Sequence, residues 1–236
     1  MNLRTSSLGE VLASSASEEV WTFVAPAIWN TLYMLAVTTV FTFILGTVLG
    51  IVLVVTDADG IKPLPVFNRA LGTIVNVFRS FPSMILIILL LPLSRLVLHR
   101  TYGADACILA LVGSCVPMLG RLVESSIHEV AKGKIEAAKA MGTGNRDIVA
   151  KVLLPEALPS LVRSYTVTTI AILGTTALAG SFGAGGLGDV AVRFGYNRFR
   201  TDVLIPTVVV LIAMVELIQI AGDAIARGIS RRRYLV

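Results

Sequence analysis

Apolar side chains fall into five long blocks along the chain, with shorter polar segments between them. The blocks cover residues 29–55, 71–98, 104–123, 164–188 and 203–225. A run of about 20 apolar residues is long enough to cross a bilayer as a helix. The pattern therefore predicts an all-α membrane protein, a polytopic helical bundle with about five transmembrane helices. Arg79 and Pro82 interrupt the second block, and Pro117 is expected to break the third, which should end at Arg121 and Glu124.

Composition supports a membrane protein and argues against two other classes. Hydrophobic residues make up 55% of the chain and charged residues 15%, whereas soluble domains carry about 25% charged residues. The net charge is +5, but the basic residues are dispersed and form no stripe of the kind that binds nucleic acid. The sequence shows no metal-ligand cluster, catalytic triad or carboxylate pair, so the chain is not expected to be an enzyme by itself.

The distribution of Lys and Arg predicts the orientation. Five spans put the termini on opposite faces, and with a cytoplasmic C-terminus 13 basic residues lie inside and six outside. By the positive-inside rule, the N-terminus is external and the loop of about residues 125–160 is cytoplasmic. The expected organisation is an external N-terminal segment (1–27), a transmembrane domain (28–227) and a basic cytoplasmic tail (228–236).

The predicted cytoplasmic loop has strong local signals for a helical hairpin. Residues 135–141 are good helix formers, and Gly142 can adopt the left-handed conformation that ends a helix. Thr143 or Asn145 is expected to cap a second short helix. This helix should run to Leu154 and stop at Pro155. The alternative is a solvated amphipathic hairpin without a partner.

The order Glu-Ala-Ala, three residues, Gly, nine residues and then Val-Leu-Leu-Pro resembles the EAA loop of permeases of ATP-binding-cassette (ABC) importers. Residues 75–82, 183–188 and 218–223 look like the methionine-importer branch of these permeases. The resemblance implies that the loop couples the permease to an ATPase. The implied coupling residues are Glu136, Ala137, Ala138, Met141, Gly142, Leu154 and Pro155.

This resemblance implies a type I ABC importer permease fold in a bacterial inner membrane. It also implies a homodimer, two ABC ATPase subunits that bind ATP and Mg, and an external amino-acid-binding protein, with no cofactor in this chain. The implied substrate is a small amino acid, most specifically methionine. Two alternatives are an importer of the same type for another small solute and an ATP-independent secondary transporter. The latter should show two related halves and paired intramembrane charges.

The fourth apolar block contains the candidate pathway residues Thr168, Thr175 and Leu178. Its threonines could line a pore, or they could return hydrogen bonds to their own helix. The family resemblance places the side chain that closes the pathway near Leu178.

Four glycines, Gly183, Gly185, Gly186 and Gly188, follow that block. Their G-x-G-x-x-G spacing matches a dinucleotide-binding loop, but such a loop needs a preceding strand in a βαβ unit. A turn at the external mouth or close helix packing is the better interpretation.

Two charged residues within the apolar blocks need a polar environment. Arg79 is expected either to extend towards the membrane surface or to pair with Glu124 or Glu216. Glu216 is expected to serve packing or pairing rather than proton transfer.

Overall fold

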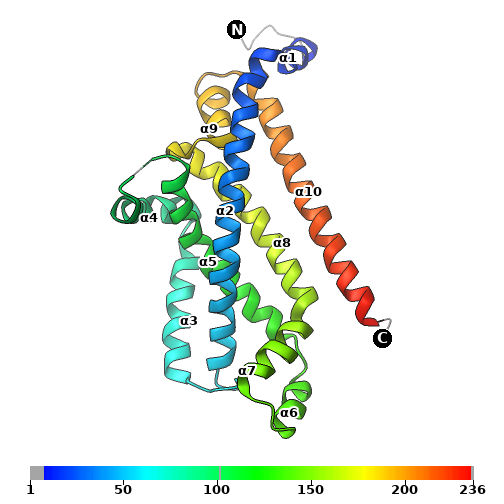
Figure 1. Cartoon of the computed structure of the whole chain (residues 1–236). Helices are drawn as coiled ribbons and strands as arrows, with labels where there is room; N and C mark the ends of the chain where they lie inside the picture. Colours follow the sequence, from blue (N-terminus) through cyan, green and yellow to red (C-terminus); the bar gives the residue numbers. More distant parts are fainter. Residues whose placement is uncertain (1–7, 101, 235–236) are drawn as a thin grey trace. The chain divides into compact units, whose positions relative to one another are not determined.

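The computed structural model describes residues 8–100 and 102–234, and every regular element in these ranges is helical (Figure 1). Three segments labelled η are wider turns of π-helix that continue neighbouring α-helices. The elements are α1 (Leu8–Ser15), α2 (Glu18–Thr56), α3 (Pro65–Ser80), α4 (Ser83–Leu98), α5 (Ala104–His128), α6 (Lys132–Ala140), α7 (Asn145–Asp147), η1 (Ile148–Leu153), α8 (Leu154–Ala179), η2 (Gly180–Ala184), α9 (Gly186–Val190), η3 (Ala191–Tyr196) and α10 (Thr201–Tyr234).

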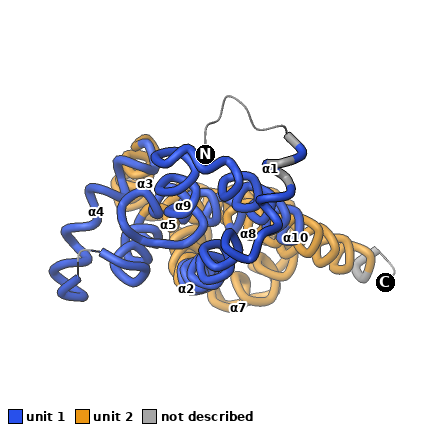
Figure 2. Tube along the Cα trace, turned by 90° about the horizontal axis from the view of Figure 1, so that it is seen from above, with its two compact units in different colours: residues 1–40, 82–113, 169–218 blue, residues 41–81, 114–168, 219–236 orange. Residues whose placement is uncertain are grey.

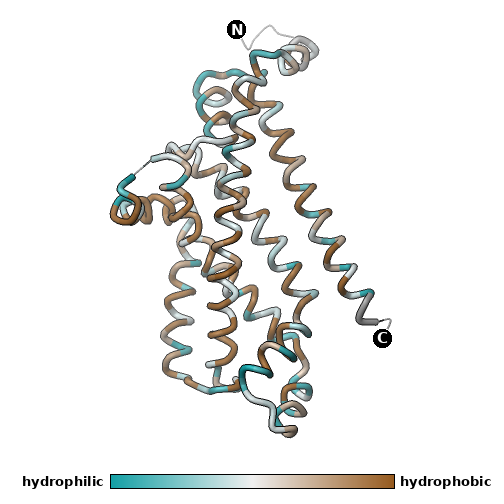
Figure 3. Tube along the Cα trace, viewed as in Figure 1, coloured by the Kyte–Doolittle hydropathy of each residue, from teal (hydrophilic) through white to brown (hydrophobic). Residues whose placement is uncertain are grey.

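Four continuous helical segments among the described residues are long and apolar enough to cross a membrane, and a bent pair, α3 with α4, raises the count to five if it forms one span. Figure 3 shows the apolar character of α2 and α10 along most of their length. The all-α membrane fold is confirmed. The predicted tail and N-terminal segment are partly helical, because α10 continues to Tyr234 and α2 begins at Glu18.

The second apolar block folds as two helices that are bent by 110° at their junction. Phe81 is extended, with φ −73° and ψ 137°, and Pro82 follows with φ −56° and ψ 129°. A proline disfavours the α conformation of the residue before it, so Phe81 leaves the helix. Pro82 thus separates the block into two 16-residue helices.

The third block does not break at Pro117, so that prediction was wrong. Helix α5 continues through Pro117 and ends at His128, beyond the predicted end at Arg121–Glu124. Leu119 and Val123 are completely buried on the following turns. Burial against neighbouring helices holds the backbone helical although proline removes one hydrogen bond.

The chain divides into two compact units, coloured separately in Figure 2. Unit 1 consists of residues 1–40, 82–113 and 169–218, and unit 2 of residues 41–81, 114–168 and 219–236. Within unit 2, α2 and α5 approach closely at Gly46, Gly50 and Gly120, where a Cβ would lie within 3 Å of the facing helix. Such small residues are typical of packed membrane helices, because they let backbones approach.

Candidate functional site

Helix α6 ends in the manner that its sequence predicts. Gly142 has φ +75°, and its amide donates to the carbonyl of Lys139 at 2.9 Å, while the amide of Thr143 donates to that of Ala138 at 3.1 Å. These two bonds form a Schellman motif, in which a residue in the left-handed region satisfies the last carbonyls of a helix. The predicted role of Gly142 as a helix terminator is confirmed.

The two alanines of the EAA sequence have different environments. Ala137 is exposed, together with Glu136 and Met141, and Met141 has 78% of its surface accessible. Ala138 is 3% exposed and belongs to the apolar core of unit 2. The family resemblance implied that both alanines are coupling residues. In the structure, Ala137 can meet a partner, whereas Ala138 lets α6 lie close to its own core.

The start of the second helix differs from the sequence prediction. Gly144 is the N-cap of α7, and no side chain of the described residues caps this helix. The amide of Ile148 donates to the carbonyl of Gly144 at 3.0 Å, which begins the helical ladder. The expected caps, Thr143 and Asn145, were therefore wrong, since the observed N-cap is Gly144, which lies between them.

The second helix also does not stop at Pro155. Helices α7, η1 and α8 follow one another without a gap. The helical path from Asn145 continues through α8 until Phe182 and Gly183, whose backbone angles are not helical. The π-helical segment Ile148–Leu153 lies directly before the proline. A π-turn changes the hydrogen-bond register, which accommodates the amide that Pro155 lacks. The coupling segment, defined here as residues 132–155, therefore leads directly into α8.

An apolar core supports the coupling segment from within unit 2. Ile148 and Leu153 are almost fully buried, and they belong to the same cluster as Ala157, Leu161 and Ala138. An ion pair between Lys134 and Glu156 joins α6 to the first turn of α8. The hairpin is thus a packed element with one exposed face.

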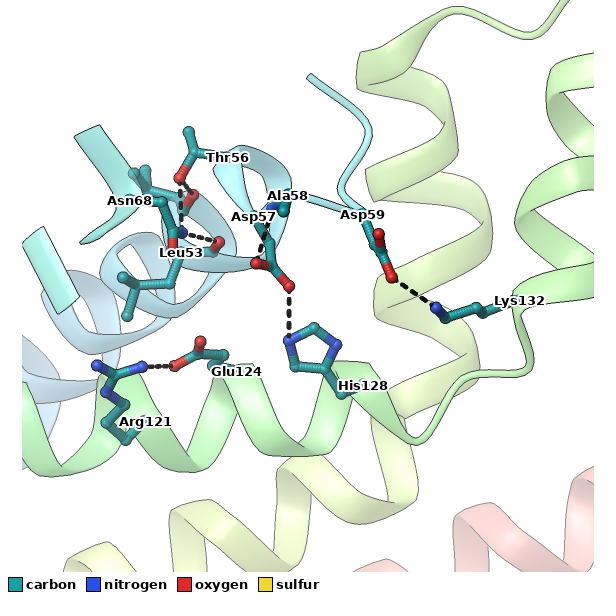
Figure 4. Close-up of polar contacts among 11 residues, drawn as sticks. Leu53, Thr56, Asp57, Ala58, Asp59, Asn68, Arg121, Glu124, His128 and Lys132 are labelled. Carbon is teal, nitrogen blue, oxygen red and sulfur yellow. Dashed lines mark hydrogen bonds and ion pairs between the residues drawn. The ribbon is translucent and has the colours of Figure 1, made fainter. Parts of the chain in front are cut away.

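The turn between α2 and α3 also contacts this region, as Figure 4 shows. Asp57 lies 3.8 Å from Nε2 of His128, the last residue of α5, and Asp59 lies 2.9 Å from Nζ of Lys132, the first residue of α6. The hydrogen bond and charge of Lys132 lower the pKa of Asp59, and Asp59 in turn raises the pKa of Lys132. Sequence analysis missed these pairs, because residues about 70 positions apart carry no local signal of their contact.

Glu124, one of the two partners considered for Arg79, pairs with a different arginine. Glu124 pairs with Arg121 at 2.7 Å, and Nη2 of Arg121 also donates to the carbonyl of Gly72 at 2.8 Å. Arg79 is exposed in the chain. In unit 1, Glu216 lies along an otherwise mostly apolar groove of about 430 Å³ between α8 and α10.

The threonines of α8 bond to their own helix. Thr168 is completely buried, and its hydroxyl donates to the carbonyl of Ser164 at 2.8 Å. Thr175 donates to the carbonyls of Ala171 and Ile172, at 3.1 and 2.8 Å. Leu178 is different, because 42% of its surface is exposed. Of the three candidate pathway residues, Leu178 has the largest surface available to a pathway.

The glycine-rich segment forms a tight turn that packs against α2 within unit 1. Gly183, Gly185 and Gly186 have φ of +84°, +77° and +79°. Asn30 donates to the carbonyl of Ala184 at 3.0 Å, and the amide of Leu187 donates to the hydroxyl of Thr31 at 2.8 Å. A Cβ on Gly188 would lie 2.0 Å from the carbonyl oxygen of Ala177. The interpretation as a turn with close packing is confirmed, and its helical surroundings do not match a dinucleotide loop.

Comparison with known proteins places this architecture in a family. The family model described as "Binding-protein-dependent transport system inner membrane component" matches residues 46–233. The chain belongs to this family. The match includes the whole coupling segment and the glycine-rich turn. Membership makes the chain the inner membrane component of a transport system.

Two relatives are similar to this protein over most of the chain. A probable D-methionine transport system permease protein from Vibrio cholerae is 41% identical over 206 residues, which cover 87% of this chain and 92% of the relative. The methionine import system permease protein of Bacillus subtilis is 44% identical over 165 residues, or 70% of this chain and 74% of the relative.

Solved structures agree with this assignment. A chain of the inward-facing MetNI methionine ABC transporter is 38% identical, has a TM-score of 0.88 and is matched over 90% of this chain and 99% of its own length. A chain of an amino acid ABC transporter solved with histidines shares 14% identity and a TM-score of 0.68, covering 94% of this chain and 99% of the other. At that identity the likeness concerns the fold alone.

Proposed function

We propose that this chain is the permease subunit of an ATP-driven methionine importer. Two copies form the translocation pathway, two ABC ATPase subunits bind ATP and Mg, and an external binding protein delivers the amino acid. The observation that carries the proposal is the coupling segment, which has an exposed EAA face and continues without a break into a membrane helix. The names of the similar permeases support methionine as the substrate.

The exposed face of α6 is the proposed docking surface for the ATPase. Glu136 supplies a negative charge for a basic group, Ala137 permits close approach, and Met141 is an exposed, adaptable apolar contact. We assign Leu154 and Pro155 to the transmission of movement rather than to contact with the ATPase. Leu154 is partly buried, and the two residues are the first two of α8.

Movement of the docked hairpin is transmitted along α8. Because the chain is helical without a gap from Asn145 to the end of α8 at Ala179, a tilt of the coupling segment becomes a tilt of α8, which carries Leu178. We assign Leu178 to the closed pathway, and Thr175 to its polar side. A thousandfold gradient of a neutral solute costs about 4 kcal/mol, so accurate transmission matters more than a large force.

The proposal includes an orientation, with the coupling segment cytoplasmic and the N-terminus external in a bacterial inner membrane. A cysteine introduced at the exposed position Ala140 tests whether the coupling segment is cytoplasmic. In intact cells that lack the ATPase subunits, an impermeant maleimide should leave the Ala140→Cys variant unlabelled, and the variant should react after the membrane is opened. Labelling of intact cells would contradict the orientation.

The substrate is tested in vesicles that contain the permease with its ATPase partners and binding protein. Uptake of labelled methionine should require ATP, and unlabelled methionine should compete better than any other small amino acid. Stronger competition by another solute would favour the related importer for that solute. ATP-independent uptake driven by an ion gradient would favour a secondary transporter and contradict the proposal.

A further inference from the structure

The turn between α2 and α3 (residues 57–64) is a firmly built element of unit 2. The carboxylate of Asp57 accepts from the amide of Ala58 at 2.7 Å, and the carbonyl of Asp57 accepts from the amide of Gly60 at 3.0 Å. The side-chain amide of Asn68 donates to the carbonyl of Leu53 and the hydroxyl of Thr56, at 2.6 and 3.0 Å. These bonds connect α3 to the end of α2 and fix the turn between them.

Two carboxylates of this turn reach both sides of the linker that precedes the coupling segment. Asp57 faces His128 and Asp59 faces Lys132, and residues 129–131 connect the two basic residues (Figure 4). Glu136, one helical turn after Lys132, adds to the charge that raises the pKa of Lys132. The ammonium group of Lys132 therefore interacts both with the carboxylates of the turn and with Glu136 of the EAA sequence.

These pairs are too exposed to contribute much to stability. The side chains of Asp59 and Lys132 are 75% and 77% exposed, and exposed pairs are usually worth about 0–1 kcal/mol. A cavity of about 170 Å³ lies beside them, lined by apolar residues such as Val54, Ile61 and Leu153 as well as by the charged groups. Side chains do not fill the space between the α2–α3 turn and the start of α6. The charged groups at the edge of this cavity can therefore set the position of α6 while still allowing α6 to move.

We propose that Asp57 and Asp59 are positioning residues for coupling: they hold the start of the coupling segment against the α2–α3 turn, so that movement of the segment also moves α2 and α3. This inference rests on the proposed function. Movement of the ATPase would then reach the membrane helices by two routes, one through α8 and one through the α2–α3 turn. Loss of the second route allows ATP to be hydrolysed without full movement of the helices.

The test is a charge exchange in the complete reconstituted transporter. Asp59→Lys and Lys132→Asp each place like charges together, and the double variant restores an opposite pair. Each single variant should raise the ATP hydrolysed per methionine imported by roughly threefold, because exposed pairs shift equilibria only a few-fold. The double variant should return the ratio close to that of the wild type. Asp59→Asn, which removes the charge without repulsion, should give a smaller increase.

The matched control is Arg100→Asp, which reverses a similarly exposed pair, with 70% and 50% accessible side chains, in unit 1. It should leave the ratio unchanged. Unchanged ratios in both single variants would overturn the inference, and so would a double variant no better than either single one. A wild-type complex that imports no methionine would instead contradict the proposed function itself.

Discussion

The coupling segment and the glycine-rich turn are both chain reversals beside α8, yet they are built in opposite ways. The coupling segment in unit 2 uses one left-handed residue, Gly142, and leaves most side chains of α6 exposed. The turn in unit 1 uses three residues with positive φ and buries Gly186 and Gly188. One element leaves side chains accessible for the proposed contact with the ATPase, whereas the other uses close backbone contact to hold its own helices together.

This difference predicts how the two segments respond to substitution. A side chain added to the buried turn should disturb folding, because backbone atoms already occupy the space. A side chain changed on the coupling segment should leave folding intact and alter the interaction with the ATPase.

The largest effect is expected for Gly188→Ala. The new methyl group would lie 2.0 Å from the carbonyl oxygen of Ala177, and relief of this overlap should cost about 3 kcal/mol of unfolding free energy. Thermal unfolding of the purified protein in detergent measures the loss. Gly133→Ala is the control, since nothing lies within 4 Å of its Cβ position in α6. Equal melting temperatures of the two variants would contradict the proposed difference between the tightly packed glycine-rich turn and the open coupling segment.

Gly142→Val should give a smaller but specific defect. A left-handed conformation costs a residue with a Cβ about 1–2 kcal/mol, and the cost falls on the end of α6. The variant should insert normally but retain less ATPase during purification. Gly144→Val is the control, because Gly144 has φ −66° and open space around it. Equal ATPase retention by both variants would show that the conformation of Gly142 is unimportant.

Glu136→Lys should weaken the ATPase interaction without altering the fold. Glu136 is exposed, so its replacement leaves the core unchanged, but a basic partner group would be repelled. We expect about a tenfold loss of affinity, measured by titration of the detergent-solubilised permease with its ATPase. Glu129→Lys, the same charge change before α6, should have little effect. Comparable losses for both variants would indicate a general charge effect.

The smallest effect is expected for Leu178→Ala, which should increase passive leak of small solutes from vesicles by a few-fold. Truncation of a side chain at a hydrophobic constriction weakens the barrier to water and solutes. Leu158→Ala is a suitable control, because Leu158 lies in the same helix and is 39% exposed, against 42% for Leu178. A leak no larger than that of the control would exclude Leu178 from the gate.

Local sequence predicted the parts of this architecture that depend on local physics. Apolar block length predicted the membrane helices, and Gly142 predicted the end of α6, since a positive φ is a single-residue preference. Sequence failed at Pro117 and Pro155, where tertiary packing or a π-turn keeps a helix continuous. It also missed the contacts Asp57–His128 and Asp59–Lys132, because long-range side-chain contacts leave no periodic pattern in the sequence.

The central claim is that the exposed face of α6 is covered by the ATPase while the core beneath it belongs to the permease. Maleimide labelling of an Ala137→Cys variant, with Cys107 and Cys115 replaced by alanine, tests this directly. The account predicts rapid labelling of the permease alone and strong protection in the assembled complex, while Tyr102→Cys, at a position where 78% of the side chain is exposed, reacts equally in both. Equal labelling of the Ala137→Cys variant with and without the ATPase would contradict the claim.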